Sequence, residues 1–458
     1  MRVEAQQATG ASLIDSSALT KAIEDRYRFA SPLLNFRLTG DLSGEPEFFQ
    51  FGRSICYGRS DKVIRDSNAR STDLISSTSF NDDSLMLPFN PTEVIDNLRL
   101  ERYPSGQFGH FERTLKSLYY RLRPFTNRTL RAYVQRFRAN KWRNRPFPNW
   151  PVDTTVEDLC ETLLLLFMQK RGIDRIPFIW FWPRGARASV SMTHDVETAA
   201  GRDFCNTLLK INESYSIKAS FQIVPEQRYQ VPTAFLDKLR AHGCEVCVQD
   251  LNHDGRLFDQ QDEFRRRAFL INKYAREYGA SGFRSAVLYR KPEWYEHLDF
   301  SYDMSIPNVA HLDPQRGGCC TVMPYFIGDM VELPLTTVQD YTLFHILNET
   351  SISLWRTQFE MILSKNGMAT FIVHPDYVTG SKTLALYKDL LAMLNEFRSQ
   401  TNLWFALPGE ISDWWRARDQ MSIVRSDNAW RITGDGADQA VLAFAAAVDG
   451  KLVYELPE

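Results

Sequence analysis

SVSMTHDVE, residues 189–197, is the stretch of sequence that decides the fold we expect. Its first four residues alternate small and apolar side chains and predict a strand, and His194, Asp195 and Glu197 follow directly. Beyond it, strand-like and helical patterns alternate as far as residue 418. Such alternation is typical of a parallel sheet covered by helices. We therefore predict an α/β fold, a distorted (β/α)7-type barrel of about seven strands, over residues 186–418.

Three later strands of this predicted barrel also end in polar residues. Gln249 and His253 follow one strand, Arg284 ends the next, and His374 ends a third. The chemistry of a (β/α)-barrel lies at the carboxyl ends of its strands. We therefore expect these side chains to meet Asp195 at one face, although His374 could instead be a core imidazole bonded to a backbone carbonyl.

The order and spacing of these residues resemble a divergent polysaccharide deacetylase, the NodB-homology domain of carbohydrate esterase family 4. The resemblance covers about half of the chain, and rests on Asp195, Gly282-Phe283-Arg284 and Phe371-Ile372-Val373-His374. It implies a hydrolase of carbon–nitrogen bonds other than peptide bonds, which removes N-acetyl groups from amino sugars or glycan intermediates. In that family Asp195 is the catalytic base, Arg284 orients it and His374 is the general acid.

The same resemblance implies a divalent metal, with zinc as the first choice, held by Glu197 and His253. Two positions depart from the family pattern. Val196 stands where the second acid directly follows the base in common members, and Gln249 occupies the place of an expected histidine. A neutral amide oxygen is a poor zinc ligand beside histidine. Gln249 is therefore a weak candidate ligand, and His194 is another that could compensate.

The missing histidine leaves two further functions open. One is a metal-independent amide hydrolase similar to the allantoinase-like branch of the same superfamily. The other is a catalytically inactive relative that binds glycans.

Aromatic residues in the loops after the strands are candidates for binding a carbohydrate substrate. These are Tyr289, Trp294 and Tyr325, with Tyr341 as a further candidate. The apolar faces of sugars stack well on such rings. Packing in the core is the alternative for each of them.

The regions on either side of the barrel carry no recognisable chemistry. Residues 1–185 read as an α+β region, and residues 419–458 as a small β appendage. Within the first, residues 113–145 contain eleven Lys or Arg and no acid. This segment could be a cationic face for an anionic partner, or two solvated helices paired with acids elsewhere. A further helix is expected from a capping box of Thr154 and Glu157 to Gly172.

The composition is that of a soluble globular protein, with 44% hydrophobic and 24% charged residues. A net charge of −2 does not favour a nucleic-acid partner. The seven cysteines are odd in number, and we expect reduced thiols. The N-terminus lacks an apolar segment of the secretory kind, and no apolar run approaches the length of a membrane span. We therefore expect a cytoplasmic protein without a transmembrane segment.

Overall fold

The computed structural model describes residues 16–30, 33–40, 42–61, 73–104, 147–311, 315, 317–427 and 429–457. The basic segment 113–145 lies outside these residues, so an anionic partner there stays a prediction. No helix in the described ranges is long and apolar enough to cross a bilayer.

A nine-stranded sheet forms the centre of the molecule, in the order β12-β13-β11-β10-β9-β8-β7-β14, with β15 also paired to β7. Its strands are β7 (Ala188–Val196), β8 (Ala219–Ile223), β9 (Glu245–Gln249), β10 (Gly282–Arg284), β11 (Tyr302–Asp303), β12 (Tyr325–Ile327), β13 (Met330–Glu332), β14 (Met368–Ile372) and β15 (Leu403–Phe405). Only β12 is antiparallel to its neighbour. The predicted parallel α/β fold is therefore confirmed.

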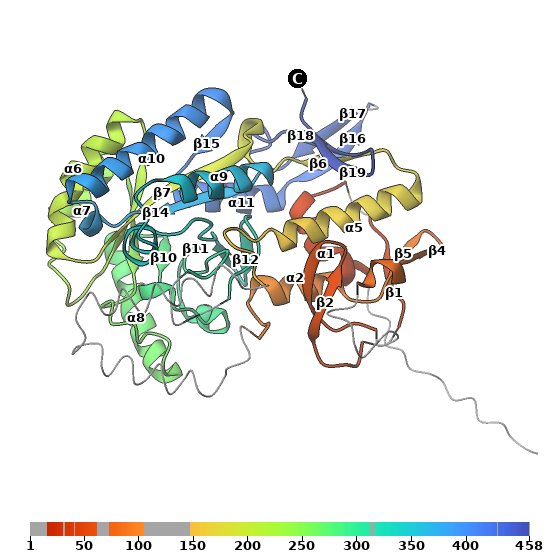
Figure 1. Ribbon diagram of the computed structural model, residues 1–458, viewed down its shortest axis with the longest axis horizontal. Helices are drawn as coiled ribbons and strands as arrows, with labels where there is room; N and C mark the ends of the chain where they lie inside the picture. Colours follow the sequence, from red (N-terminus) through yellow and green to blue (C-terminus); the bar gives the residue numbers. More distant parts are fainter. Residues whose placement is uncertain are drawn as a thin grey trace, which may run out of the picture.

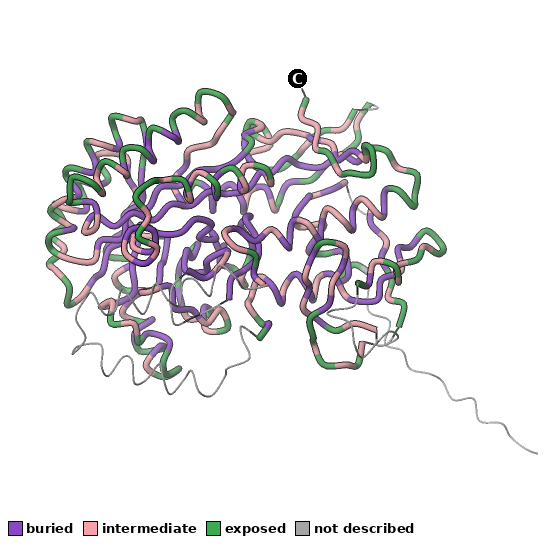
Figure 2. Tube along the Cα trace, viewed as in Figure 1, coloured by how far each residue is buried: buried purple, intermediate pink, exposed green. Residues whose placement is uncertain are grey.

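Helices cover the outside of this sheet (Figure 1). They are α6 (Ala199–Ser214), α7 (Thr233–Ala241), α8 (Gln261–Tyr278), α9 (Ser353–Ser364), α10 (Ser381–Gln400) and α11 (Pro408–Gln420). Figure 2 shows buried strands at the centre and exposed residues on the outer helices. All nine residues of β7 are buried, as expected for a parallel strand that is covered on both faces.

Threonine hydroxyls join the two ends of the sheet where the backbone ladder is missing. Thr336 Oγ1, in the segment after β13, donates to Met368 O at 2.7 Å and accepts from Thr370 N at 3.0 Å. Thr370 Oγ1 donates to Pro334 O at 2.9 Å, and Thr337 Oγ1 donates to Thr370 O at 2.7 Å. These buried side chains satisfy the edge of β14. Hydrogen bonds from side chains, in place of a backbone ladder, therefore close the barrel on this side. This replacement is the distortion of the barrel.

The N-terminal region and the C-terminal strands pack together (Figure 1). The region contains α1 (Ser16–Tyr27), β1 (Phe36–Leu38), β2 (Glu47–Phe51), β3 (Ser54–Gly58), β4 (Ser79–Asn81), β5 (Ser84–Leu87), α2 (Pro91–Arg99), α5 (Thr155–Arg171) and β6 (Arg175–Ile179). The last strands are β16 (Ser422–Ser426), β17 (Ala429–Thr433), β18 (Leu442–Val448) and β19 (Lys451–Glu455). Since β18 lies between β19 and β6, the predicted appendage completes a sheet that begins before the barrel.

Helix α5 begins and ends where the sequence predicts, but its predicted capping box is wrong. Thr154 makes no capping bond, while Gly172 ends the helix in the left-handed conformation. Glu157 is fully buried instead, and its carboxylate accepts from Arg26 and from the Thr321 hydroxyl. Glu157 therefore contacts residues distant in the sequence, instead of the backbone at the start of its own helix.

We expect Thr336→Val to destabilise the protein, because it leaves Met368 O and Thr370 N buried without their partner. The expected loss is about 1–3 kcal/mol in the free energy of unfolding, measured by denaturant titration. Thr433→Val, in the exposed strand β17, is the matched control and should cost much less. Equal losses in the two variants would contradict the role given to the threonines in closing the barrel.

Candidate active site

The carboxyl ends of four strands bring ionisable side chains to one place in the barrel. Asp195 lies near the end of β7 with Glu197 just beyond it, and Arg284 ends β10. His253 lies in the loop after β9, and His374 follows β14. Side-chain contacts among all five join them into one cluster.

Asp195 and Arg284 form a buried ion pair at the base of this cluster. The guanidinium of Arg284 also donates to Thr193 Oγ1 at 2.9 Å and to Met304 O at 3.2 Å, so its position is fixed by both neighbours. The other carboxylate oxygen of Asp195 accepts from Gln249 Nε2 at 3.2 Å. Asp195 is thereby held in one orientation, with its Oδ2 toward His374.

His374 is held by a carboxylate that the sequence did not reveal. Asp340 accepts from the backbone N of His374 at 2.7 Å, from its Nδ1 at 2.6 Å and from Tyr341 N at 2.8 Å. Nε2 of His374 then lies 3.5 Å from Glu197 Oε1 and 3.9 Å from Asp195 Oδ2. Burial alone would lower the pKa of His374, but the Asp340 and Glu197 carboxylates raise it well above its usual value.

Glu197 and His253 form the second ion pair, with 2.9 Å between Oε1 and Nε2. Burial alone would raise the pKa of Glu197, but the two histidines hold it well below its usual range. Burial would likewise lower the pKa of His253, and the Glu197 carboxylate raises it instead. This pair is the more exposed part of the cluster, since Asp195 and His374 are each only 3% exposed. Solvent therefore approaches the site from the side of Glu197 and His253.

The loop that carries His253 has strained backbone. Asp250 and His253 have φ of 51° and 56°, in the left-handed region that side chains other than glycine rarely adopt. Each such residue costs roughly 1–3 kcal/mol and persists only where its surroundings impose it. The loop is fastened by Arg267 of α8, which donates to both carboxylate oxygens of Asp254 at 2.8 and 2.9 Å. Strain held in this way is typical of a loop that positions a functional side chain.

His194, a candidate metal ligand from the sequence, faces away from the cluster. Its Nδ1 donates to Val373 O at 2.8 Å, and its Nε2 accepts from Asn212 Nδ2 at 3.0 Å. Burial lowers the pKa of His194 to about 4. Both ring nitrogens are occupied in this neutral imidazole, so the prediction that His194 binds a metal is wrong.

The aromatic residues predicted to bind sugar lie elsewhere or in packed positions. Tyr325 is buried, and its hydroxyl donates to Arg99 O of α2, so the prediction for Tyr325 is wrong. Trp294 packs on Phe264, with ring centroids 5.3 Å apart, and takes Lys291 on its face. These contacts indicate that Trp294 packs in the core instead of binding a sugar.

Tyr289 is 8% exposed and lies beside Gly255, in the loop of His253. Tyr377, which was not among the predicted residues, packs at a tilt against His374 with ring centroids 4.9 Å apart. Tyr341 lies next to Tyr377, at 5.4 Å. Both of these tyrosines are half-buried, so they are better placed than Trp294 and Tyr325 to meet a ligand at His374.

The described residues do not fit the divalent metal that the family resemblance implies. No three His, Cys, Asp or Glu side chains among them are grouped so that they could hold a metal ion. Arg284 is already paired with Asp195, and Nε2 of His253 already lies 2.9 Å from Glu197 Oε1. Gln249 offers only a neutral amide oxygen, which is buried without a partner in this part of the chain.

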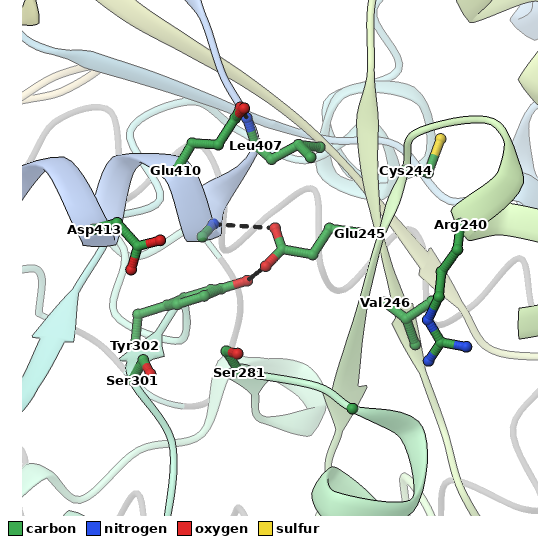
Figure 3. Close-up of a pocket in the computed structure, with 12 residues that line it drawn as sticks. Arg240, Cys244, Glu245, Val246, Ser281, Ser301, Tyr302, Leu407, Glu410 and Asp413 are labelled. Carbon is green, nitrogen blue, oxygen red and sulfur yellow. Dashed lines mark hydrogen bonds between the residues drawn. The ribbon is translucent and has the colours of Figure 1, made fainter. Parts of the chain in front are cut away.

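A cavity lies at the opposite end of the strands, where Glu245 and Tyr302 begin β9 and β11 (Figure 3). It measures about 350 Å³ and is lined by Glu245 at the start of β9, by Tyr302 at the start of β11 and by the first turn of α11. Glu245 accepts from the Tyr302 hydroxyl at 2.6 Å and from Gly409 N at 3.0 Å. In barrels this end generally serves stability rather than chemistry.

No family model and no curated protein matches the chain. Among solved structures it is similar to a putative polysaccharide deacetylase from Mycobacterium smegmatis, with 17% identity, a TM-score of 0.44, and coverage of 54% of this chain and 96% of that one. It is also similar to Puue allantoinase, with 13% identity, a TM-score of 0.41, and 52% and 92% coverage. A third similar structure is a probable polysaccharide deacetylase from Pseudomonas aeruginosa, with 12% identity, a TM-score of 0.40, and coverage of 50% of this chain and 91% of that one.

We expect Asp340→Asn to lower the pKa of His374, because burial then acts on the imidazolium without its closest carboxylate. The NMR titration of the His374 ring should move to lower pH. The ring signals of His242, which is half-buried at the end of α7 and pairs with Glu213, are the internal reference. A curve for His374 that overlays that of the wild type would show that Asp340 does not control its protonation.

Proposed function

We propose that this chain is a hydrolase of carbon–nitrogen bonds in amides, with Asp195 as general base and His374 as general acid. The observation that carries the proposal is the pairing of these two groups, with 3.9 Å between Asp195 Oδ2 and His374 Nε2. Each is held by a buried partner of opposite charge, Arg284 for the carboxylate and Asp340 for the imidazolium. A base and an acid fixed side by side are what hydrolysis of an amide requires.

In the proposed reaction, Asp195 takes a proton from a water molecule as its oxygen attacks the amide carbonyl carbon. The new C–O bond gives a tetrahedral intermediate. His374 then gives its proton to the nitrogen as the C–N bond breaks, which releases a carboxylic acid and an amine. The proton on Asp195 restores His374, across the short distance between the two side chains. Protons and bonds balance without a further reactant.

The negative oxygen of the intermediate needs a positive group close by. In our proposal His253 serves this need, since the Glu197 carboxylate raises its pKa and the pair of His253 and Glu197 is the more exposed part of the cluster. Zinc is left out of the proposal, because the donor set does not fit it. Glu197 then acts by keeping both histidines protonated.

An N-acetylated sugar or glycan intermediate is the substrate class we propose. Support comes from Tyr341 and Tyr377, half-buried rings beside His374 that suit the apolar face of a sugar. The seven buried free thiols favour a reducing compartment, so we place the reaction in the cytoplasm. A glycan-binding protein without catalysis is the competing function, and the loss of activity on removing the base separates the two.

We expect Asp195→Asn to abolish acetate release from a panel of N-acetylated sugars, with a fall in kcat of about 100-fold or more. Glu245→Gln is the matched control, because Glu245 is a hydrogen-bonded carboxylate at the other end of the same sheet. The control should keep most of the activity. Release of acetate by Asp195→Asn at the rate of the wild type would contradict the proposal, as would the absence of hydrolysis from the wild type across amide substrates.

A further inference from the structure

The loop between β8 and α7 joins the segments that follow β7 and β9 at the carboxyl ends of the strands. Glu226 N donates to Leu251 O at 2.9 Å, in the segment that follows β9. Arg228 Nε donates to Glu197 O at 3.0 Å, directly after β7. The two segments carry His253 and Glu197, the more exposed part of the cluster, so this loop borders the side from which solvent approaches the site.

Side chains fasten this loop on both sides of Arg228. The Tyr229 hydroxyl donates to Val196 O, at the end of β7, at 2.7 Å. The Glu226 carboxylate accepts from the Tyr274 hydroxyl of α8 at 3.1 Å. Because the loop is held in this way, the position of Arg228 is set before a ligand arrives. A group that is positioned in advance binds its ligand at a lower cost in conformational entropy.

Arg228 is exposed, and it forms no ion pair within the described part of the chain. Its bond to the Glu197 carbonyl is the only side-chain hydrogen bond that it makes among those residues, so Nη1 and Nη2 are open to a ligand. Burial and, more weakly, the nearby Arg228 charge act to lower the pKa of His253, against the raising effect of Glu197. The guanidinium therefore lies within electrostatic reach of the cluster.

The acids on the neighbouring segments have cationic partners of their own. Asp254, in the segment that follows β9, pairs with Arg267 of α8 at 2.8 Å. Asp203 of α6 pairs with Arg202 at 2.8 Å. Arg228 is thus a cation at the border of the site whose charge none of these carboxylates takes up.

We propose that Arg228 binds an anionic group of the substrate, a phosphate or a carboxylate, on the part of the molecule that stays outside the cluster. The N–H groups of a guanidinium form a planar fork that matches two oxygens of either anion. The amide would lie against Asp195 and His374, with the charged group beside Arg228. This inference rests on the hydrolase proposed above and narrows its substrates to N-acetylated sugars that carry a negative charge.

Isothermal titration calorimetry on Asp195→Asn, which consumes no probe, tests this recognition without catalysis. The probes are N-acetylglucosamine 6-phosphate, N-acetylmuramic acid, which carries a carboxylate, and the neutral N-acetylglucosamine, all at one ionic strength. We expect at least one anionic probe to bind about 10-fold or more tightly than the neutral probe. The comparison of the two anionic probes distinguishes a phosphate from a carboxylate.

Adding Arg228→Gln to this background should remove the preference for the anionic probe. Arg228→Lys should keep part of the preference, because lysine retains the charge but loses the planar fork. Both variants should fold, since Arg228 is exposed. Arg240→Gln is the matched control and should keep the preference. Arg240 is also exposed and also donates to a backbone carbonyl, that of Tyr278, but it lies at the other end of the sheet.

Acetate release by protein with Asp195 intact separates this inference from the hydrolase itself. Binding of neither anionic probe more tightly than the neutral one, or a preference that Arg228→Gln leaves in place, would overturn the role of Arg228 even if the probes are hydrolysed. A fall in kcat by the same factor for all probes in Arg228→Gln would also overturn it, because Arg228 would then only support Glu197. Charge-dependent binding that Arg228→Gln abolishes, without hydrolysis by the wild type, would support recognition by Arg228 and contradict the hydrolase.

Discussion

The buried ion pair between Arg284 and Asp195 is the constraint on which the rest of the site depends. Placing a full charge inside a protein costs several kcal/mol, and a nearby opposite charge with further hydrogen bonds must offset this. Arg284 meets that need with Asp195, Thr193 and Met304, which belong to β7 and to the end of β11. The pair therefore joins the carboxyl ends of β7 and β10 at the point from which Glu197 continues the chain.

Around this ion pair, acidic and basic side chains of the protein are paired with one another. The carboxylates of Asp195, Glu197 and Asp340 face the cations of Arg284, His253 and His374. The pKa of each histidine is raised because a carboxylate opposes the effect of burial. A metal ion would have to compete with these cations for the same carboxylates. In the proposed reaction, protonated histidines supply the positive charge. In other hydrolases a metal ion supplies this charge.

Much of this site could be predicted from the sequence, because parallel strands carry their carboxyl ends to one face. Asp195, Arg284 and His374 were found in this way. The alternation of side chains along β7 could also have excluded His194, since Thr193 and Asp195 both contact Arg284 and the residue between them must face outward. Asp340 could not be found, because it lies in a segment without periodic pattern and reaches His374 only through the fold. The pairing of β18 with β6 is equally non-local.

Hydrolysis by protein stripped of metal is the measurement that tests the central claim most directly. The protein is dialysed against a strong chelator, its metal content is determined by mass spectrometry, and acetate release is compared before and after. The charge-balanced cluster predicts unchanged hydrolysis with far less than one equivalent of metal. Activity that disappears with a bound metal and returns on addition of Zn²⁺ would contradict the claim that these side chains act by themselves.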